Sequence, residues 1–105
     1  MLLHDSHRKG ICSELLAKEY FIKKGYLVFS PENAAGPIDL ITLDEQNNIC
    51  FYDVKTNNLR KNGKKIYRAN NKVKGINIVT VYVDVETKEI IITNPKGAKL
   101  DYEME

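Results

Sequence analysis

The chain has 105 residues, of which 43% are hydrophobic and 29% are charged. This length and composition predict one globular domain, residues 1–105, and exclude both two independent cores and a disordered chain. No apolar run approaches the roughly 18 residues of a membrane helix, and residues 1–5 lack the features of a signal peptide. Two lone cysteines form neither a zinc site nor a disulfide framework. We therefore expect a cytoplasmic (intracellular) protein without a membrane partner.

The net charge of +2 conceals an uneven distribution of charge along the chain. Residues 1–53 carry eight acidic and five basic side chains, and residues 84–105 carry six acidic and three basic ones. Residues 54–83 carry no acidic side chain, which is typical of a surface that binds a phosphate backbone, although a solvated basic loop has the same composition. Their eight basic residues are Lys55, Arg60, Lys61, Lys64, Lys65, Arg68, Lys72 and Lys74.

Residues 6–24 have the pattern of one long amphipathic helix. Asp5 or Ser6 is suited to cap its start, and Gly25 is suited to end it in a left-handed conformation. Apolar residues at four-residue spacing predict the side that packs on the rest of the protein. The predicted stripe contains Ile11, Leu15, Lys18 and Ile22, with Cys12, Leu16 and Tyr20 beside it.

Several short β-rich segments follow the helix and predict a mixed sheet of about five strands, an α/β or α+β fold. A single helix leaves one sheet face thinly covered, which favours a partner protomer or a nucleic acid there. The aromatic residues Tyr20, Phe21, Tyr26 and Phe29 are expected in the core, and residues 95–105 are expected to fray. The segments cover residues 26–30, 38–43, 49–56, 76–83 and 89–93, and the basic segment contains a turn signal at Asn62-Gly63.

The second and third of these segments read as a hairpin around a polar turn at residues 44–48. Because side chains alternate along a strand, this turn places two apolar pairs on the face of the hairpin that we expect to be buried. On the same face, at the end away from the turn, two carboxylates lie opposite each other. A shift of one residue would abolish the arrangement. The facing pairs are Leu43 with Ile49, Ile41 with Phe51, and Asp39 with Asp53.

Two opposed carboxylates beside apolar neighbours must share either a proton or a cation. Mg²⁺ is a common solution, because it accepts one or two protein carboxylates and keeps several waters. Lys55 follows Asp53 on the same face, where an ammonium group can orient or deprotonate an attacking water and offset phosphate charge. The alternative is that Asp39 lies at an exposed strand end and that Asp53 and Lys55 form a surface ion pair.

Glu14 is a fourth candidate, on the helix and between the small residues Gly10 and Ala17. A glycine inside a helix costs about 1 kcal/mol relative to alanine. Gly10 therefore indicates either close approach of another backbone, from the sheet or a nucleic acid, or a helix that begins only near Ile11. On physical grounds alone, Glu14 is equally well an ordinary solvated residue.

Glu14, the segment Gly36-Pro37-Ile38-Asp39-Leu40 and the segment Tyr52-Asp53-Val54-Lys55-Thr56 together resemble the PD-(D/E)XK nuclease superfamily. The resemblance covers residues 8–56 and implies the αβββ core of restriction endonucleases. It is strongest to small endonucleases such as Holliday-junction resolvases and homing-type enzymes. The chain departs from the pattern in that Ile38 separates Pro37 from Asp39, and in that Asp53 stands where glutamate is commoner.

The resemblance implies roles for five of these residues. Asp39 and Asp53 would bind Mg²⁺, for which Mn²⁺ can substitute, together with the Val54 carbonyl. Lys55 would handle the nucleophilic water, and Glu14 would assist as an outer metal ligand. The implied reaction is hydrolysis of a DNA phosphodiester bond to a 5′-phosphate and a 3′-hydroxyl.

The expected function is thus that of a metal-dependent DNA endonuclease. We expect it to recognise branched or otherwise non-linear DNA, as a junction resolvase does, with a homing- or nicking-type endonuclease as the alternative. A nucleic-acid-binding module without catalysis and a protein-interaction domain are further alternatives. The basic segment would contact phosphates and sugars rather than bases. Cutting both strands needs two sites, so we expect a homodimer formed through the exposed sheet face or through residues 76–93.

Overall fold

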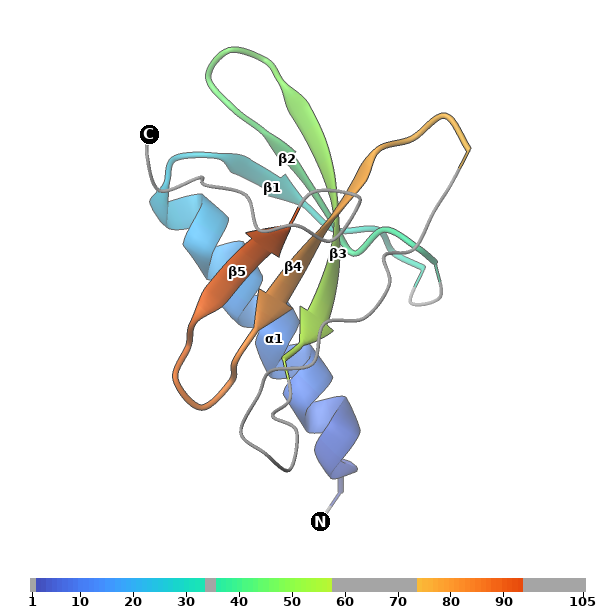
Figure 1. Ribbon diagram of the computed structural model, residues 1–105, viewed down its shortest axis with the longest axis vertical. Helices are drawn as coiled ribbons and strands as arrows, with labels where there is room; N and C mark the ends of the chain where they lie inside the picture. Colours follow the sequence, from blue (N-terminus) through green and yellow to red (C-terminus); the bar gives the residue numbers. More distant parts are fainter. Residues whose placement is uncertain (1, 34–35, 58–73, 94–105) are drawn as a thin grey trace.

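The computed structural model describes residues 2–33, 36–57 and 74–93 of the chain. Within them one helix precedes five strands, which form a single sheet in chain order (Figure 1). β3 and β4 pair in parallel and the other neighbours pair antiparallel, so the predicted mixed α+β fold is confirmed. The elements are α1 (Asp5–Lys23), β1 (Leu27–Phe29), β2 (Leu40–Leu43), β3 (Ile49–Thr56), β4 (Ile78–Val83) and β5 (Ile90–Thr93).

The ends of α1 follow the sequence signals only in part. Gly25 has a φ of 91° just after the helix, as its left-handed stop requires. The N-cap is His4, which makes no capping hydrogen bond with its side chain, so the predicted cap by Asp5 or Ser6 is wrong. Asp5 instead lies in the first turn, where its carboxylate contacts Arg8 and Lys9 and favours the positive end of the helix dipole.

The buried side of α1 differs from the predicted stripe. Ser13, Ala17 and Phe21 are buried, whereas Ile11, Leu15 and Ile22 are at least half exposed. The side of α1 that faces the sheet is the one with small residues, because Ser13 and Ala17 allow the helix backbone to approach the strands closely. Leu16 and Tyr20 pack at the margin of this contact.

Aromatic rings join α1 to the centre of the sheet. The Phe21 ring lies 4.6 Å from that of Tyr52 on β3 and 6.0 Å from that of Tyr26, measured between ring centroids. Leu40 of β2 is buried in the same core, together with Val79, Val81 and Val83 of β4. Stacked and tilted ring contacts of this kind add to the hydrophobic gain of burial. These contacts hold α1 in place over β3.

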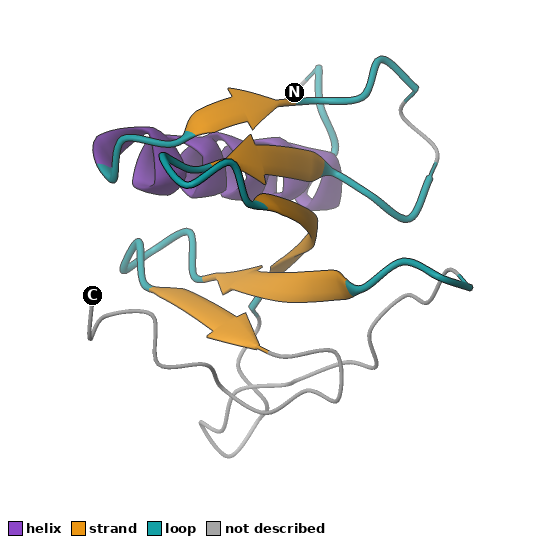
Figure 2. Ribbon diagram, turned by 90° about the horizontal axis from the view of Figure 1, so that it is seen from above, coloured by secondary structure: helices purple, strands orange, loops and turns teal. Residues whose placement is uncertain are grey.

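The hairpin has the predicted register, but its faces are reversed relative to the prediction. Leu43 pairs with Ile49 and Ile41 pairs with Phe51, as expected. However, Leu40 and Tyr52 take the side under α1, so these two pairs lie on the other face, and Ile49 is 60% exposed. Figure 2 shows that no second helix of the described chain covers that face. Alternation of side chains in the sequence identifies the two faces of a strand, but it does not identify the face that packs against the helix.

The second half of the sheet is buried on both faces. Every residue of β4 is buried, which confirms the predicted buried strand, although it begins two residues later than expected. The turn between β4 and β5 is held by Asp84 and contains Lys88 at a φ of 65°. The predicted turn at Asn62-Gly63 and the tail at 95–105 lie outside the described residues. No helix in the described ranges is both long and apolar enough to span a membrane.

Candidate active site

The two opposed carboxylates lie where β2 begins, beside the middle of β3. The strand pairing ends with Leu40 opposite Tyr52, and the Asp39 backbone N–H donates a hydrogen bond of 2.8 Å to the Tyr52 carbonyl, one residue out of that register. The side chains of Asp39 and Asp53 are nevertheless within hydrogen-bonding contact. Asp53 is buried and Asp39 is partly buried. The predicted juxtaposition is confirmed, and the alternative of an exposed strand end does not hold.

Asp39 has an unusual electrostatic environment. Burial raises its pKa, and the hydrogen bond and charge of Asp53 and the charge of Glu14 raise it further. A hydrogen bond of 2.7 Å from the Val54 N–H to Asp39 Oδ2 opposes these effects, and the resulting pKa is about 6. Carboxyl groups in such a pair repel each other unless a proton or a cation lies between them. The site is therefore one that a cation would stabilise.

Lys55 supplies a positive charge beside this pair. Its Nζ lies 3.1 Å from Asp53 Oδ2, and only 17% of its side chain is exposed. An ion pair this well buried differs from a mobile surface pair, because solvent screens it less. The surface ion pair considered from the sequence is thus excluded, and an ammonium group is held next to the carboxylates.

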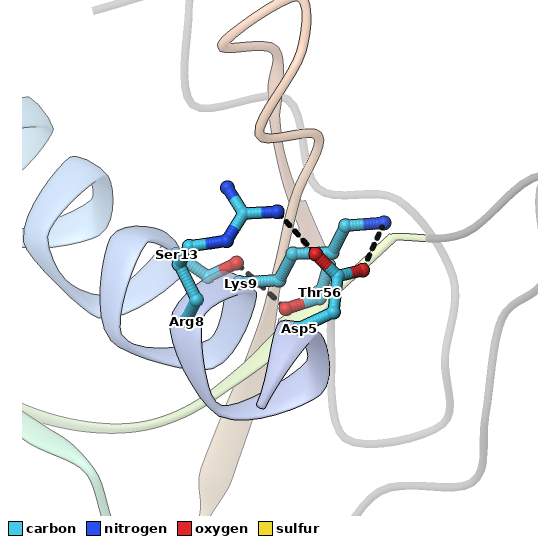
Figure 3. A network of polar contacts seen from close by, with 5 residues as sticks. All are labelled: Asp5, Arg8, Lys9, Ser13 and Thr56. Atoms are coloured by element: carbon cyan, nitrogen blue, oxygen red, sulfur yellow. Dashed lines mark hydrogen bonds and ion pairs between the residues drawn. The ribbon is translucent and has the colours of Figure 1, made fainter. Parts of the chain in front are cut away.

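Glu14 approaches the pair from the helix. Its charge contributes to the raised pKa of Asp39, so α1 brings a third carboxylate near the site. The neighbouring residue Ser13 is buried, and its Oγ lies 2.7 Å from Oγ1 of Thr56, the residue after Lys55 (Figure 3). This hydrogen bond joins the helix to β3 one residue from each of two candidate site residues.

A groove borders the site between the first turns of α1 and the end of β3. Its volume is about 440 Å³, and its lining includes Ser6, Lys9 and Gly10 on the helix and Lys55 on the strand. Lys9 also pairs with Asp5 at 3.4 Å (Figure 3). A side chain at Gly10 would meet nothing within 4 Å, so no backbone of the described residues approaches it, and α1 already begins at Asp5. Two explanations of Gly10 are therefore wrong: close approach of the sheet, and a helix that begins only near Ile11. Close approach of a nucleic acid stays a prediction.

The donor set fits a hard divalent cation. Mg²⁺ takes one or two carboxylates from a protein and completes its shell with water and substrate oxygens, and Asp39 and Asp53 provide two such groups. The described residues contain no group of three or more acidic, histidine or cysteine side chains close enough to form a complete cage. The role of the Val54 carbonyl stays a prediction.

Most of the predicted DNA-binding residues lie outside the described chain. Of the seven, only Lys74 is described, and it is exposed. Sequence reasoning did not identify Ser13 and Thr56. The available signal was weak: a small polar residue one turn before Ala17 on the helix, and a hydroxyl directly after Lys55. The remaining six are Arg60, Lys61, Lys64, Lys65, Arg68 and Lys72.

The chain is similar to a curated protein and to a solved structure. No family model matches the chain. A UPF0102 protein from Chlorobium limicola (strain DSM 245 / NBRC 103803 / 6330) is 37% identical over 65 residues, which are 60% of this chain and 50% of that protein. The chain thus spans about half the length of this curated relative.

A solved structure of a bacterial homing endonuclease, I-Ssp6803I, superposes with a TM-score of 0.70. The match covers 88% of this chain and 70% of that one at 18% identity. The two chains share a fold. The α+β fold expected from the sequence is thereby confirmed.

Proposed function

We propose that this protein is a metal-dependent endonuclease that hydrolyses phosphodiester bonds of DNA. The observation that carries the proposal is the convergence of Asp39, Asp53 and Lys55 on one face of the hairpin, with Glu14 nearby. Asp39 and Asp53 would hold Mg²⁺ or Mn²⁺, with the Val54 carbonyl as a further ligand and Glu14 in an outer position. The shared fold with a homing endonuclease supports this reading.

Each side chain then has a distinct task. A bound divalent cation polarises the scissile phosphate and makes a coordinated water more acidic. Lys55, held at 3.1 Å from Asp53, orients the attacking water and offsets the charge that develops on the phosphate. Glu14 orients the outer water shell. The products are a 5′-phosphate and a 3′-hydroxyl.

The substrate class has two candidates. A junction resolvase would act on branched DNA, which it would recognise by its shape and backbone charge. A homing- or nicking-type endonuclease is the second candidate, and the fold shared with I-Ssp6803I favours it. The basic residues between Arg60 and Lys74 would contact the DNA backbone in either case. Cleavage of both strands would require a homodimer with two sites.

Cleavage assays test the proposal. Labelled four-way junction, flap, nicked and linear duplex DNA are incubated with the protein in Mg²⁺, in Mn²⁺ and in EDTA. We expect metal-dependent cutting that falls at least 100-fold in Asp53→Asn and in Lys55→Met. The preferred DNA identifies the substrate class.

A matched pair of helix variants provides the control. Glu14→Gln should reduce cutting, whereas Glu19→Gln removes an exposed carboxylate from the same helix and should not. The protein is a binding module without catalysis if two results coincide. Wild type cuts none of these DNAs with either metal, and wild type and Asp53→Asn bind DNA with the same affinity. If it does not bind DNA at all, the protein-interaction reading replaces both.

A further inference from the structure

Six apolar side chains form a regular grid on the face of β1, β2 and β3 that α1 does not cover. The strand register arranges them in two rows that cross all three strands. Neighbours within a row lie about 5 Å apart, and the rows are about 7 Å apart. The first row is Leu27, Leu43 and Ile49, and the second row is Phe29, Ile41 and Phe51.

This hairpin face is exposed to solvent. Leu27 and Ile49 are each 60% exposed and Phe29 is 51% exposed, so the prediction of Phe29 as a core residue is wrong. The other three are partly buried by their neighbours in the grid. The apolar surface is on the order of 400 Å², within the range of the largest patch on a typical soluble monomer, which is often functional. The same face of β4 is buried, so the exposure is confined to β1–β3.

We propose that a second copy of this chain packs its own hairpin face on this one. A symmetric dimer needs a patch that is complementary to itself, and an apolar grid without charged side chains meets that condition. Two such faces pack about 10 Å apart, as the sheets of a sandwich do. An apolar area of this size, with a polar rim, approaches the roughly 800 Å² per partner of a stable interface.

The composition of the grid argues against a nucleic acid as the occupant. None of the six side chains is a cation or a hydrogen-bond donor, and contacts with a phosphate backbone depend on such groups. The apolar stripe on α1 is a poorer self-complementary patch, because Lys18 interrupts the series Ile11, Leu15 and Ile22. The hairpin face is therefore the stronger candidate for contact between two copies.

The carboxylates border this face. In a third row, Asp53 lies two residues beyond Phe51 on the same side of β3, and Asp39, just before β2, contacts it. A dimer through the first two rows would leave this third row at the rim, with two sites on one assembly. This arrangement deepens the proposed function, but the dimer itself stands on the grid alone and is measured without DNA or metal.

Sedimentation velocity across a range of protein concentrations tests the dimer. The test variant is Ile49→Lys and its matched control is Ile22→Lys, since these isoleucines are 60% and 59% exposed. Leu27→Lys is a second test variant in the other strand of the first row. Because all three side chains are largely exposed, circular dichroism should show the wild-type fold in each variant.

We expect wild type and Ile22→Lys to sediment with twice the monomer mass. Ile49→Lys and Leu27→Lys should raise the dimer dissociation constant at least tenfold. A wild type that stays monomeric at 100 µM, roughly the upper range of weak association, overturns the proposal. Dimers that persist in both test variants overturn it as well. Dimers that dissociate only in Ile22→Lys also overturn it, and they assign the interface to α1.

Discussion

Ser13 and Thr56 are 43 residues apart in sequence, yet their hydroxyl oxygens lie 2.7 Å apart between α1 and β3. Ser13 is buried and directly precedes Glu14, and Thr56 directly follows Lys55. The hydrogen bond therefore joins the two elements beside the candidate site. It helps to hold the helix carboxylate at a set distance from the strand, because a part-buried hydroxyl pair exchanges partners with water less readily than an exposed one.

Removal of the Ser13 hydroxyl should affect catalysis more than folding. Ser13→Ala loses one net hydrogen bond and should lower the free energy of unfolding by about 1 kcal/mol. If the bond positions Glu14, turnover of DNA should fall about tenfold while DNA affinity stays within twofold, since small displacements of catalytic groups are costly. Single-turnover cleavage and urea unfolding measure the two effects separately.

Thr56→Ser is the conservative control for this bond. It keeps a hydroxyl at the same place, so its turnover should stay close to that of wild type. A turnover in Ser13→Ala equal to that of wild type would show that the bond is only structural.

Asp39→Asn should stabilise the protein at neutral pH in the absence of divalent metal. The pKa of Asp39 rises from 3.8 in the unfolded chain to about 6 in the folded protein, so the folded state binds the proton more tightly. Wild-type stability should consequently fall as the pH rises from about 4 to 6. The full shift corresponds to about 3 kcal/mol, which solvent screening of this partly buried group reduces to about 1–2 kcal/mol.

Urea unfolding at pH 4 and at pH 8 tests this assignment. The gain in Asp39→Asn should be present at pH 8 and absent at pH 4, where Asp39 is mostly protonated in the folded state. Equal stabilities at pH 8 would contradict the raised pKa. The same variant should lose cleavage activity, because asparagine is a weaker ligand for a hard cation.

Mg²⁺ should stabilise the folded protein through the same carboxylates. A cation that binds only the folded state at one hundred times its dissociation constant adds about 2.7 kcal/mol to the free energy of unfolding. The gain should shrink at pH 5, because a proton competes for Asp39. Thermal melts with and without Mg²⁺ measure it.

The double variant Asp39→Asn with Asp53→Asn is the control for the metal. Its melting temperature should not respond to Mg²⁺. A response equal to that of wild type would place the cation elsewhere on the protein.

Gly10→Ala should separate stability from DNA binding. A methyl group at this position meets nothing within 4 Å, and alanine favours the helix over glycine by about 1 kcal/mol. The variant should therefore unfold at higher urea concentration. If a DNA strand occupies the groove between Gly10 and Lys55, its affinity should fall at least threefold. Stabilisation with unchanged affinity and cleavage would exclude the groove from the DNA path.

The sequence contained most of the local information. Alternation along residues 38–56 and a polar turn of suitable length were sufficient for the register of the hairpin from Leu40 to Tyr52, and for the contact between Asp39 and Asp53 next to it. The same reasoning placed Lys55 on their face and found the helix, the strands and the left-handed Gly25. These features depend on neighbours in sequence, where side-chain period and turn chemistry are strong constraints.

Tertiary contacts decided which faces became the core. Both sides of α1 and both sides of the hairpin carry apolar residues, so periodicity alone did not select between them. The small residues Ser13 and Ala17 permitted close packing on β3, which left Ile22 and Ile49 exposed. The partly buried Lys55 pair, the Ser13–Thr56 bond and the raised pKa of Asp39 all follow from that choice, because each depends on groups brought together by folding.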